Sequence, residues 1–428
     1  MYDLRIRPLG HFDVAVVGGG VAGVAAAVTA ARQGASVILI ERSGVLGGTL
    51  TDGFVPRIID GENKGGVMRE LFAALNGDGA TCRRFGKKTD ENGKNIPGDL
   101  VDIEACKYYF DKMVCESGVK LIYYSQVAAV EMNGRDIASL LVSTEYGNLA
   151  VEADVYIDAS GHGSLADMAG CRWECGHPDS GVPQPVSVGV CTVGMPEGYT
   201  GTDTTADKDA YGAMLKSHGI HVSADQANVI ALPSGKTWVF AASFGYGVRP
   251  DDIETLTAAT VDGRREGYEV IREHKRIEGY DRLAVVYSSP HVGIREGRRI
   301  IGDYRISNDD IAVGKRFEDA ICLVTFTVDV HKMSKDDTTD CRRGVRTKPY
   351  NIPYRALLPK DCDNLLLAGR CISGDFFPHA SYRVMGNMVA TGEAAGFAAA
   401  KCAKFATRPR LVDGKEVSDY MRSVGYEI

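Results

Sequence analysis

The chain has 428 residues, 44% of them hydrophobic and 25% charged, which suffices for a large core divided over about two domains. Its net charge is −7 and it has no long basic tract, which argues against nucleic acid as a partner. The 11 cysteines are scattered without a metal-ligand cluster, so we expect no metal site and reduced thiols in a cytoplasmic protein.

The first long apolar stretch, residues 13–41, admits three interpretations: a secretion signal, a membrane span or a nucleotide-binding turn. His11 and Asp13 stand where the apolar run of a signal would begin. Three consecutive glycines, Gly18 to Gly20, are poor helix formers and therefore unsuited to a span. No other apolar run approaches the length of a membrane helix, so we expect no membrane association.

The third interpretation explains this stretch as a βαβ unit. We expect a strand, a helix and a second strand at residues 12–17, 22–33 and 37–40. Gly18, Gly20 and Gly23 form GxGxxG between the first strand and the helix, where they allow a tight turn and close approach to a pyrophosphate. The helix N-terminus supplies amide donors, and Glu41 can accept a hydrogen bond from a ribose hydroxyl. The pattern predicts dinucleotide binding.

The residues after Glu41 favour flavin over nicotinamide. The segment ERSGVLGGTLTDGFVP places a second glycine pair, Gly47 and Gly48, where a flavin domain has a loop that runs back along FAD. It is similar to the GGT-x(5)-P region of disulfide-reductase flavoproteins, but Leu50 and Phe54 stand where the redox cysteines would fall. A thiol relay is therefore not expected. The lack of a second GxGxxG after a strand also argues against a separate NAD(P) domain.

Strand and turn signals continue in the next segment. Residues 119–130, 137–144 and 149–153 are expected to form a β-meander, because Asn133-Gly134 is a strong hairpin turn. A further strand begins at Val155 and runs into a glycine turn. This order favours a meander that covers the adenosine of the cofactor.

The C-terminal part predicts a second helix N-terminus at the cofactor. A buried strand at residues 365–368 is followed by Gly369, a loop, the pair Gly386-Asn387 and a small-residue helix at residues 388–401. Glycine allows close approach, and a helix N-terminus carries partial positive charge. In a flavoprotein it would face the N1–C2=O edge of the isoalloxazine, which carries the charge of the reduced ring.

With these segments the chain resembles the FAD-dependent oxidoreductase family, which has a glutathione-reductase-type FAD fold and is distantly related to fumarate reductase and succinate dehydrogenase flavoproteins. The similarity covers nearly the whole chain, in VVGGGVAGVAAA, ERSGVLGGT, YIDASGHGSLADMAG, GIREGRRIIGDY, VDVH, YNIPYRALLP, NLLLAGRCIS and RVMGNMVATGEAAG. It implies noncovalent FAD in an extended pose. Many relatives read ATGDGD where this chain has ASGHGS, so His162 and Ser164 replace two acids.

The resemblance also implies which residues contact FAD. They are Gly18, Gly20, Val21, Ala22, Gly23, Glu41, Arg42, Gly47, Gly48, Thr49, Val127, Ala159, Ser160, Gly161, Gly369, Arg370, Gly386 and Asn387. The first glycines would hold the phosphates, Ala159 and Gly161 would cover the adenosine side, and Gly386 and Asn387 would line the ring.

Four residues are candidates for catalysis: Arg383, His331, His379 and Tyr354. In fumarate-reductase-like relatives an arginine before the Gly-Asn turn binds a carboxylate or oxyanion, and Arg383 stands there, although an ion pair that anchors the loop is the alternative. Asp329 and His331 share one face if ICLVTFTVDVH is a strand, an arrangement suited to proton transfer. For His379 a proton-transfer role and a structural hydrogen bond both stay open. Tyr354 follows a proline-stiffened turn.

We expect an α/β protein with a Rossmann-like FAD-binding domain, a parallel sheet plus a β-meander, formed by residues 1–170 and 340–428. Residues 171–339 are expected to form an inserted α+β substrate or cap domain with a helix at residues 251–276. The predicted activity is hydride transfer between flavin N5 and a small oxygenated organic substrate, by a dehydrogenase or reductase. The alternatives are a redox-neutral isomerase or lyase and a flavin subunit with a redox partner protein. Homo-oligomers are compatible with the sequence.

Overall fold

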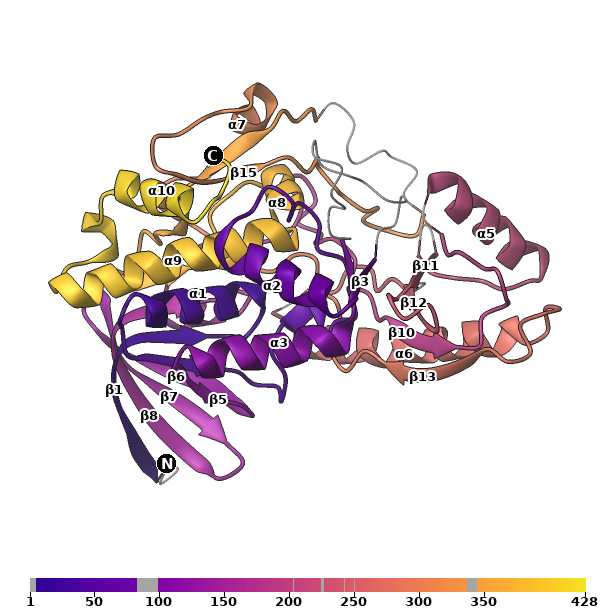
Figure 1. Cartoon of the computed structure of the whole chain (residues 1–428), viewed down its shortest axis with the longest axis horizontal. Coiled ribbons are helices and arrows are strands. Elements are labelled where there is room, and N and C mark those ends of the chain that lie inside the picture. Colours follow the sequence, from indigo (N-terminus) through magenta and orange to yellow (C-terminus); the bar gives the residue numbers. More distant parts are fainter. Residues whose placement is uncertain are drawn as a thin grey trace.

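The computed structural model describes residues 5–82, 99–202, 204–224, 227–241, 243–249, 251–336 and 345–428. It has a larger part on the left of Figure 1 and a smaller part with its own sheet on the right. Within these described ranges, no helix is long and apolar enough to cross a membrane, and no group of acidic, histidine and cysteine side chains could hold a metal ion.

The larger part contains most of the helices and strands. Its first half comprises β1 (Ile6–Val17), α1 (Val21–Arg32), β2 (Val37–Ile40), η1 (Gly48–Leu50), α2 (Gly66–Gly77), β3 (Thr81–Cys82), β4 (Leu100–Val101), α3 (Ile103–Glu116), β5 (Lys120–Ile122), β6 (Ser125–Asn133), β7 (Asp136–Thr144), β8 (Gly147–Asp158), α4 (Ser164–Met168) and β9 (Trp173–Glu174). Its second half comprises β14 (Arg299–Ile300), α7 (Asn308–Val313), β15 (Ala320–Val324), β16 (Tyr350–Pro353), η2 (Tyr354–Leu357), β17 (Leu365–Leu367), η3 (Gly369–Cys371), α8 (Phe376–Tyr382), α9 (Met385–Phe405), η4 (Pro409–Leu411) and α10 (Gly414–Ser423).

The predicted βαβ unit lies at the centre of the main sheet. In the part of the chain that the structure describes, this sheet has the order β5-β2-β1-β8-β7-β6, with β17 also paired to β8. β1 and β2 pair in parallel, with Val14 opposite Val37, as expected for a crossover through α1. All four β2 residues are buried, which explains their continuous apolar run. The fold class expected from the sequence is confirmed.

Two strand boundaries differ from the expectation. The run predicted at residues 119–130 is divided into β5 and β6. Tyr124, between them, has a φ of 52°, which bends the chain away from the parallel pairing of β5 with β2. The two strands predicted around residues 149–158 are instead the single strand β8, which pairs antiparallel with β7 and, further along, parallel with β17. One long strand therefore belongs to both the meander and the nucleotide-binding sheet.

Two glycines bring α9 against α1 along its length, as Figure 1 shows above the sheet. A Cβ at Gly392 would lie 2.0 Å from the carbonyl oxygen of Ala22, and one at Gly396 would lie 2.3 Å from that of Ala26. The four-residue spacing on both helices keeps these contacts on one face of each. Only glycine permits this backbone approach, so the two helices form one closely packed pair.

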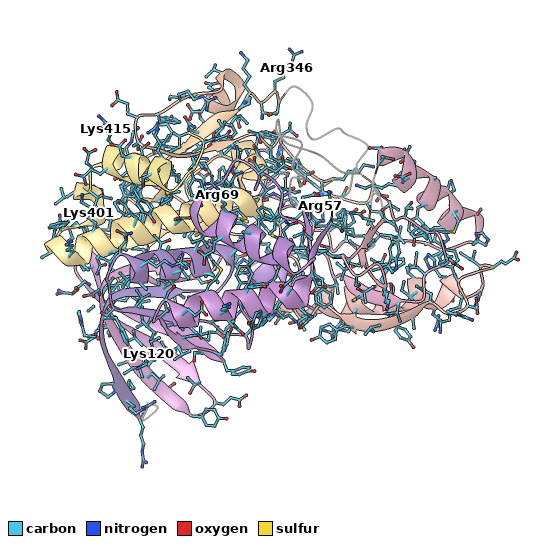
Figure 2. All side chains as sticks on the ribbon, viewed as in Figure 1. Arg57, Arg69, Lys120, Arg346, Lys401 and Lys415 are labelled. Carbon is cyan, nitrogen blue, oxygen red and sulfur yellow. The ribbon has the colours of Figure 1, made fainter. Side chains whose placement is uncertain are left out.

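A buried carboxylate on α9 joins the C-terminal segment to α2. Glu393 accepts hydrogen bonds from the Val67 amide at 3.1 Å and the Tyr426 hydroxyl at 2.8 Å, and burial raises the pKa of Glu393. Arg69, labelled in Figure 2, donates from α2 to the carbonyl oxygen of Gly425 at 2.9 Å. The end of the chain is thus held against the helices of the larger part.

The smaller part is an antiparallel sheet with two helices. Its elements are β10 (Val190–Val193), α5 (Thr205–Ser217), β11 (Asn228–Ala231), β12 (Thr237–Ala241), α6 (Ile253–His274) and β13 (Ala284–Ser288). The sheet order is β11-β12-β10-β13 among the described residues, and its core contains Trp238, Phe240 and Val270. The helix predicted at residues 251–276 is α6, whose N-cap Asp252 accepts from the amides of the first turn.

The division at residues 171 and 339 stays a prediction. Ile300, Ile306 and Ile321, which it assigns to the inserted domain, pack in the same hydrophobic cluster as the nucleotide-binding sheet. The strand β15 pairs with β16, and α10 packs on β15, because these segments are apolar enough to join the larger core. The separate sheet is formed by residues 190–288.

A buried histidine predicts acid sensitivity in the smaller part. His274 on α6 accepts or donates at 2.7 Å with the Tyr211 hydroxyl and lies 2.6 Å from the Val270 carbonyl oxygen. Burial lowers the pKa of His274 below its ordinary value, so the unfolded chain binds this proton more readily. We therefore expect the free energy of unfolding to fall as the pH drops below about 6.5.

Urea unfolding at pH 7.5 and 5.5, followed by tryptophan fluorescence, measures this effect. His274→Phe keeps an aromatic ring beside Tyr211 but cannot titrate, so its unfolding should depend less on pH than that of the wild type. An equal pH dependence in both proteins would exclude His274 as the cause.

Candidate functional site

In the GxGxxG turn, Gly18 and Gly23 pack against neighbouring backbone, whereas Gly20 faces open space. Gly18 has a φ of 101°, and a Cβ there would lie 2.6 Å from the carbonyl oxygen of Ala159. A Cβ at Gly23 would lie 1.8 Å from the carbonyl oxygen of Gly18. Gly20, by contrast, is the N-cap of α1, and a Cβ there would meet nothing within 4 Å. Backbone amides at the start of α1 can therefore meet a phosphate group.

The second glycine pair lies directly on this turn. The Gly47 amide donates to the carbonyl oxygen of Gly19 at 2.8 Å, and a Cβ at Gly48 would lie 3.1 Å from the Cα of Gly20. Both Gly47 and Gly48 have positive φ, which explains why glycine occupies each position. The Thr49 carbonyl oxygen accepts from Val55 at 3.1 Å and closes the loop.

Glu41 holds the turn from the end of β2. Its Oε2 accepts from the Gly19 amide at 2.6 Å, and its Oε1 accepts from the Ser43 amide at 2.7 Å. The carboxylate is buried, and each oxygen keeps a second lone pair for a ligand hydroxyl. The ribose contact predicted for Glu41 is compatible with this geometry and stays a prediction.

Glu41→Ala is expected to weaken FAD binding by about 10- to 100-fold, because it removes a buried acceptor and leaves the Gly19 amide unpaired. Titration of apoprotein with FAD, followed by flavin fluorescence, measures the affinity. Glu70→Ala is a matched control, since Glu70 forms an exposed ion pair with Arg32 at 2.7 Å. Equal affinities of the two variants would contradict the assignment.

The turn after β8 continues the same surface. The Ala159 amide donates to the carbonyl oxygen of Val17 at 2.9 Å, which keeps this turn beside β1. The Ser160 hydroxyl donates to Asp158 at 2.6 Å, and a Cβ at Gly161 would lie 2.6 Å from a guanidinium nitrogen of Arg370. The structure thus brings the adenosine-side turn and η3 together.

The other residues predicted to contact FAD at this end of the site differ in their burial. Val21 and Ala22 begin α1, and Val127 is buried on β6, whereas Arg42 is exposed after β2. Gly369 has a φ of 86° and donates to the Thr391 hydroxyl at 2.8 Å, so η3 is fixed against α9.

The opposite end of the site lies at the start of α9. Gly386 and Asn387 are in the first helical turn, whereas the sequence predicted them just before the helix. A Cβ at Gly386 would lie 2.0 Å from the carbonyl oxygen of Asp60, so the segment before α2 covers this turn. Asn387 is fully buried, and neither atom of its amide has a hydrogen-bond partner. Such an amide suits a heterocycle with carbonyl and N–H groups, as in the pyrimidine ring of flavin.

The charge of the site also suits FAD. Arg370 is partly buried, and its desolvation together with the guanidinium groups of Arg383 and Arg42 lowers the pKa of Arg370 to about 10. Burial, and then Arg370, Arg42 and Arg298, lower the pKa of the His162 ring. An anionic group between them would relieve this repulsion. The open Gly20, the unpaired Asn387 and the cationic Arg370 together fit the phosphates and ring of FAD.

The Arg383 side chain is only 11% exposed. It ends α8, and its Nη2 donates to the Asp329 carbonyl oxygen at 2.9 Å and to Gln184 Oε1 at 3.3 Å. Its Nη1 donates to the Arg295 carbonyl oxygen at 3.4 Å, and its Nε has no partner. The Asp329 carboxylate is 3.6 Å away, so the anchoring ion pair considered from the sequence is a loose one.

His331 lies near Arg383, but not on a strand. β15 ends at Val324, and Asp329 and His331 are in an extended loop, with the His331 Nε2 3.7 Å from the Asp329 carboxylate. The ring contacts Phe244 edge-on at 5.3 Å. Burial, and then Arg295, lower the pKa of His331 to about 3, with Asp329 opposing them. The imidazole is therefore neutral and can accept a proton.

The other two catalytic candidates, His379 and Tyr354, lie in different surroundings. His379 on α8 is fully buried near Arg299, Arg383 and Arg370, and burial lowers the pKa of its ring well below the ordinary value. Tyr354 is separated from this group, because its hydroxyl donates to the Pro409 carbonyl oxygen at 2.9 Å and its ring is buried in the core.

Sequence reasoning missed Gln184 and Phe244, which lie beside Arg383 and His331. From the sequence, Pro183-Gln184-Pro185 indicates only a proline-rich passage near the start of the expected inserted domain. Arg295 donates to the Pro185 carbonyl oxygen at 2.6 Å and stacks on Phe244 at 4.6 Å. These contacts join segments that are 51 to 110 residues apart, so no local pattern points to them.

The βαβ turn, the covering glycine loop and the buried amide at the start of α9 define a flavin-binding oxidoreductase. The chain belongs to the FAD dependent oxidoreductase family, whose model matches residues 13–421. Its cofactor is FAD, as the sequence predicted.

The chain is also similar to individual proteins. Dihydrolipoyl dehydrogenase of Bacillus subtilis (strain 168) is 31% identical over 158 residues, which is 35% of this chain and 30% of that protein. The structure of BexE is similar with a TM-score of 0.50 and 12% identity, covering 96% of this chain and 65% of that one. p-Nitrophenol 4-monooxygenase of Pseudomonas putida has a TM-score of 0.49 and 14% identity, covering 98% and 85%. At 12% identity, the similarity to BexE indicates the fold alone.

Proposed function

We propose that this flavoprotein transfers a hydride between FAD and a small, oxygenated, anionic organic substrate. The observation that carries the proposal is the buried guanidinium of Arg383, which has a free Nε beside the neutral ring of His331. A buried cation with an open donor is suited to a carboxylate or a developing oxyanion.

Arg383 is oriented before any ligand arrives. Two of its nitrogens are held by the carbonyl oxygens of Asp329 and Arg295, at 2.9 and 3.4 Å. These neutral acceptors fix the plane of the guanidinium, while the Asp329 carboxylate, 3.6 Å away, offsets only part of its charge. A preorganised cation of this kind stabilises negative charge on the substrate without rearrangement during the reaction.

His331 can take up the proton that accompanies the hydride. FAD, when bound, supplies the hydride acceptor. For an alcohol substrate, the carbon gives up its hydrogen as a hydride, the hydroxyl gives its proton to His331, and a carbonyl group forms. For His331 to act as a base, the negative charge of the bound substrate and the Asp329 carboxylate at 3.7 Å must raise its pKa from about 3, where burial and Arg295 hold it in the free protein.

Anaerobic mixing of the purified protein with hydroxy acids tests the proposal. Persistent bleaching of the flavin absorbance band by one of these acids is the expected result. A redox-neutral isomerase or lyase would turn over substrate without lasting bleaching, and a flavin subunit would need its partner protein. The proposal fails if no hydroxy acid reduces the flavin and no oxo acid or unsaturated acid reoxidises the reduced protein.

A further inference from the structure

Gln184 is a buried, uncharged side chain next to Arg383. Prolines on both sides restrict its backbone to extended geometry, since Pro185 limits the residue before it and Pro183 has a fixed φ. Its own amide donates to Glu296 Oε2 at 3.2 Å, and Glu296 is buried in an ion pair with Arg299. The side chain of Gln184 is 1% exposed.

The neighbours of Gln184 determine which way its amide group points. Its Oε1 is 3.3 Å from two donors, the Nη2 of Arg383 and the backbone amide of His331. Only the oxygen can accept from them, so the Nε2 must point away. That nitrogen is buried and has no hydrogen-bond partner. A buried donor without an acceptor is uncommon, and a ligand oxygen is one way to satisfy it.

We propose that Gln184 determines substrate specificity by donating from Nε2 to a neutral oxygen of the substrate. This inference rests on the proposed function, because it takes the anionic group of the same substrate to be bound by Arg383. The substrate class that follows is a carboxylate with a hydroxyl or carbonyl oxygen on a neighbouring carbon.

The hydrogen bond between Gln184 and Arg383 supports this class of substrate. Gln184 Oε1 is 3.3 Å from Arg383, and Nε2 is bonded to the same carbon as Oε1, so both donors lie within the length of one small molecule. The guanidinium suits the charged carboxylate, and the uncharged amide suits the hydroxyl or carbonyl oxygen. A site with a fixed donor of this kind discriminates strongly against an analogue that lacks the oxygen.

Equilibrium binding of matched acids to the FAD-loaded protein tests the inference. Lactate is compared with propionate, and mandelate with phenylacetate, by their perturbation of the absorbance spectrum after the flavin has been reduced with dithionite, so that no hydroxy acid can bleach it. In the wild type we expect at least one hydroxy acid to bind about 10-fold or more tightly than its partner. Gln184→Glu keeps an oxygen for Arg383 and His331 but removes both N–H donors, so the preference should fall to about one.

The ratio of the two affinities within a pair separates recognition of the substrate oxygen from other effects of the substitution. The added negative charge of Gln184→Glu weakens both acids of a pair alike and cancels in the ratio. If this variant does not retain FAD, the same ratio is measured for Gln184→Met. The inference is overturned if the wild type shows no preference in either pair, or if the variant keeps it. Binding requires no turnover, so a failure of hydride transfer would count against the proposed function alone.

Discussion

Arg383→Ala is expected to lower kcat/KM for the substrate by about 10²–10³-fold, the usual effect of removing one preorganised donor to a developing negative charge. The guanidinium is buried and its Nε has no partner, whereas Arg295, another cation beside His331, is engaged with the Pro185 carbonyl oxygen and the Phe244 ring. Stopped-flow reduction of the flavin by the substrate identified in the anaerobic screen measures the effect. FAD content, read from absorbance, should stay close to one per chain.

Two further variants test whether the loss of kcat/KM is specific to the guanidinium of Arg383. Arg383→Lys keeps the charge but loses the planar fork, so it should lie between alanine and the wild type. Arg172→Ala removes an exposed arginine that pairs with Asp361 at 2.9 Å, and its kcat/KM should match the wild type. Full turnover by Arg383→Ala with FAD bound would remove Arg383 from the mechanism.

Lys64→Met is expected to lower the free energy of unfolding by about 3–5 kcal/mol, because it leaves a buried acid without its partner. The Lys64 side chain is fully buried, with its Nζ 3.6 Å from Asp60 and donating to the Leu323 carbonyl oxygen at 2.8 Å. The Asp60 carboxylate in turn accepts from the Thr325 amide at 3.0 Å. Because the Asp60 carbonyl covers Gly386, the substitution should also weaken FAD binding.

Urea unfolding monitored by circular dichroism measures the stability change. Lys107→Met is the control, since Lys107 pairs on the surface with Glu104 at 2.7 Å and should change stability by less than about 1 kcal/mol. Similar losses in the two variants would show that the buried pair has no special contribution.

The sequence predicted the parts of the fold that are specified locally. The βαβ unit follows from an apolar strand, a glycine turn and a small-residue helix within 30 residues, and each glycine is required by a backbone contact or an open approach. The helix α6 follows from its acidic start and basic end. The position of Glu41 follows from the spacing of the same unit.

Features that depend on distant contacts were not predictable in this way. The alternation in residues 321–331 indicates a strand, but β15 ends at Val324, opposite Tyr350, where β16 begins. The chain before Tyr350 turns toward α7, where the Lys348 amide donates to the carbonyl oxygen of Ile311 at 2.9 Å. Asp60 meets Thr325 across 265 positions, and Gln184 meets Arg383 across 199. Nothing in the residues around Asp60 or Gln184 indicates these partners, because the fold alone brings them together.

The close packing of α1 and α9 has a consequence for the order in which the protein can mature. α1 is synthesised first, at residues 21–32, whereas the glycines that fit against it are residues 392 and 396. A ribosome must therefore complete nearly the whole chain before the phosphate end and the ring end of the site can be joined. We expect nascent chains that stop before Met385 to be unable to retain FAD, so cofactor loading would follow translation rather than accompany it.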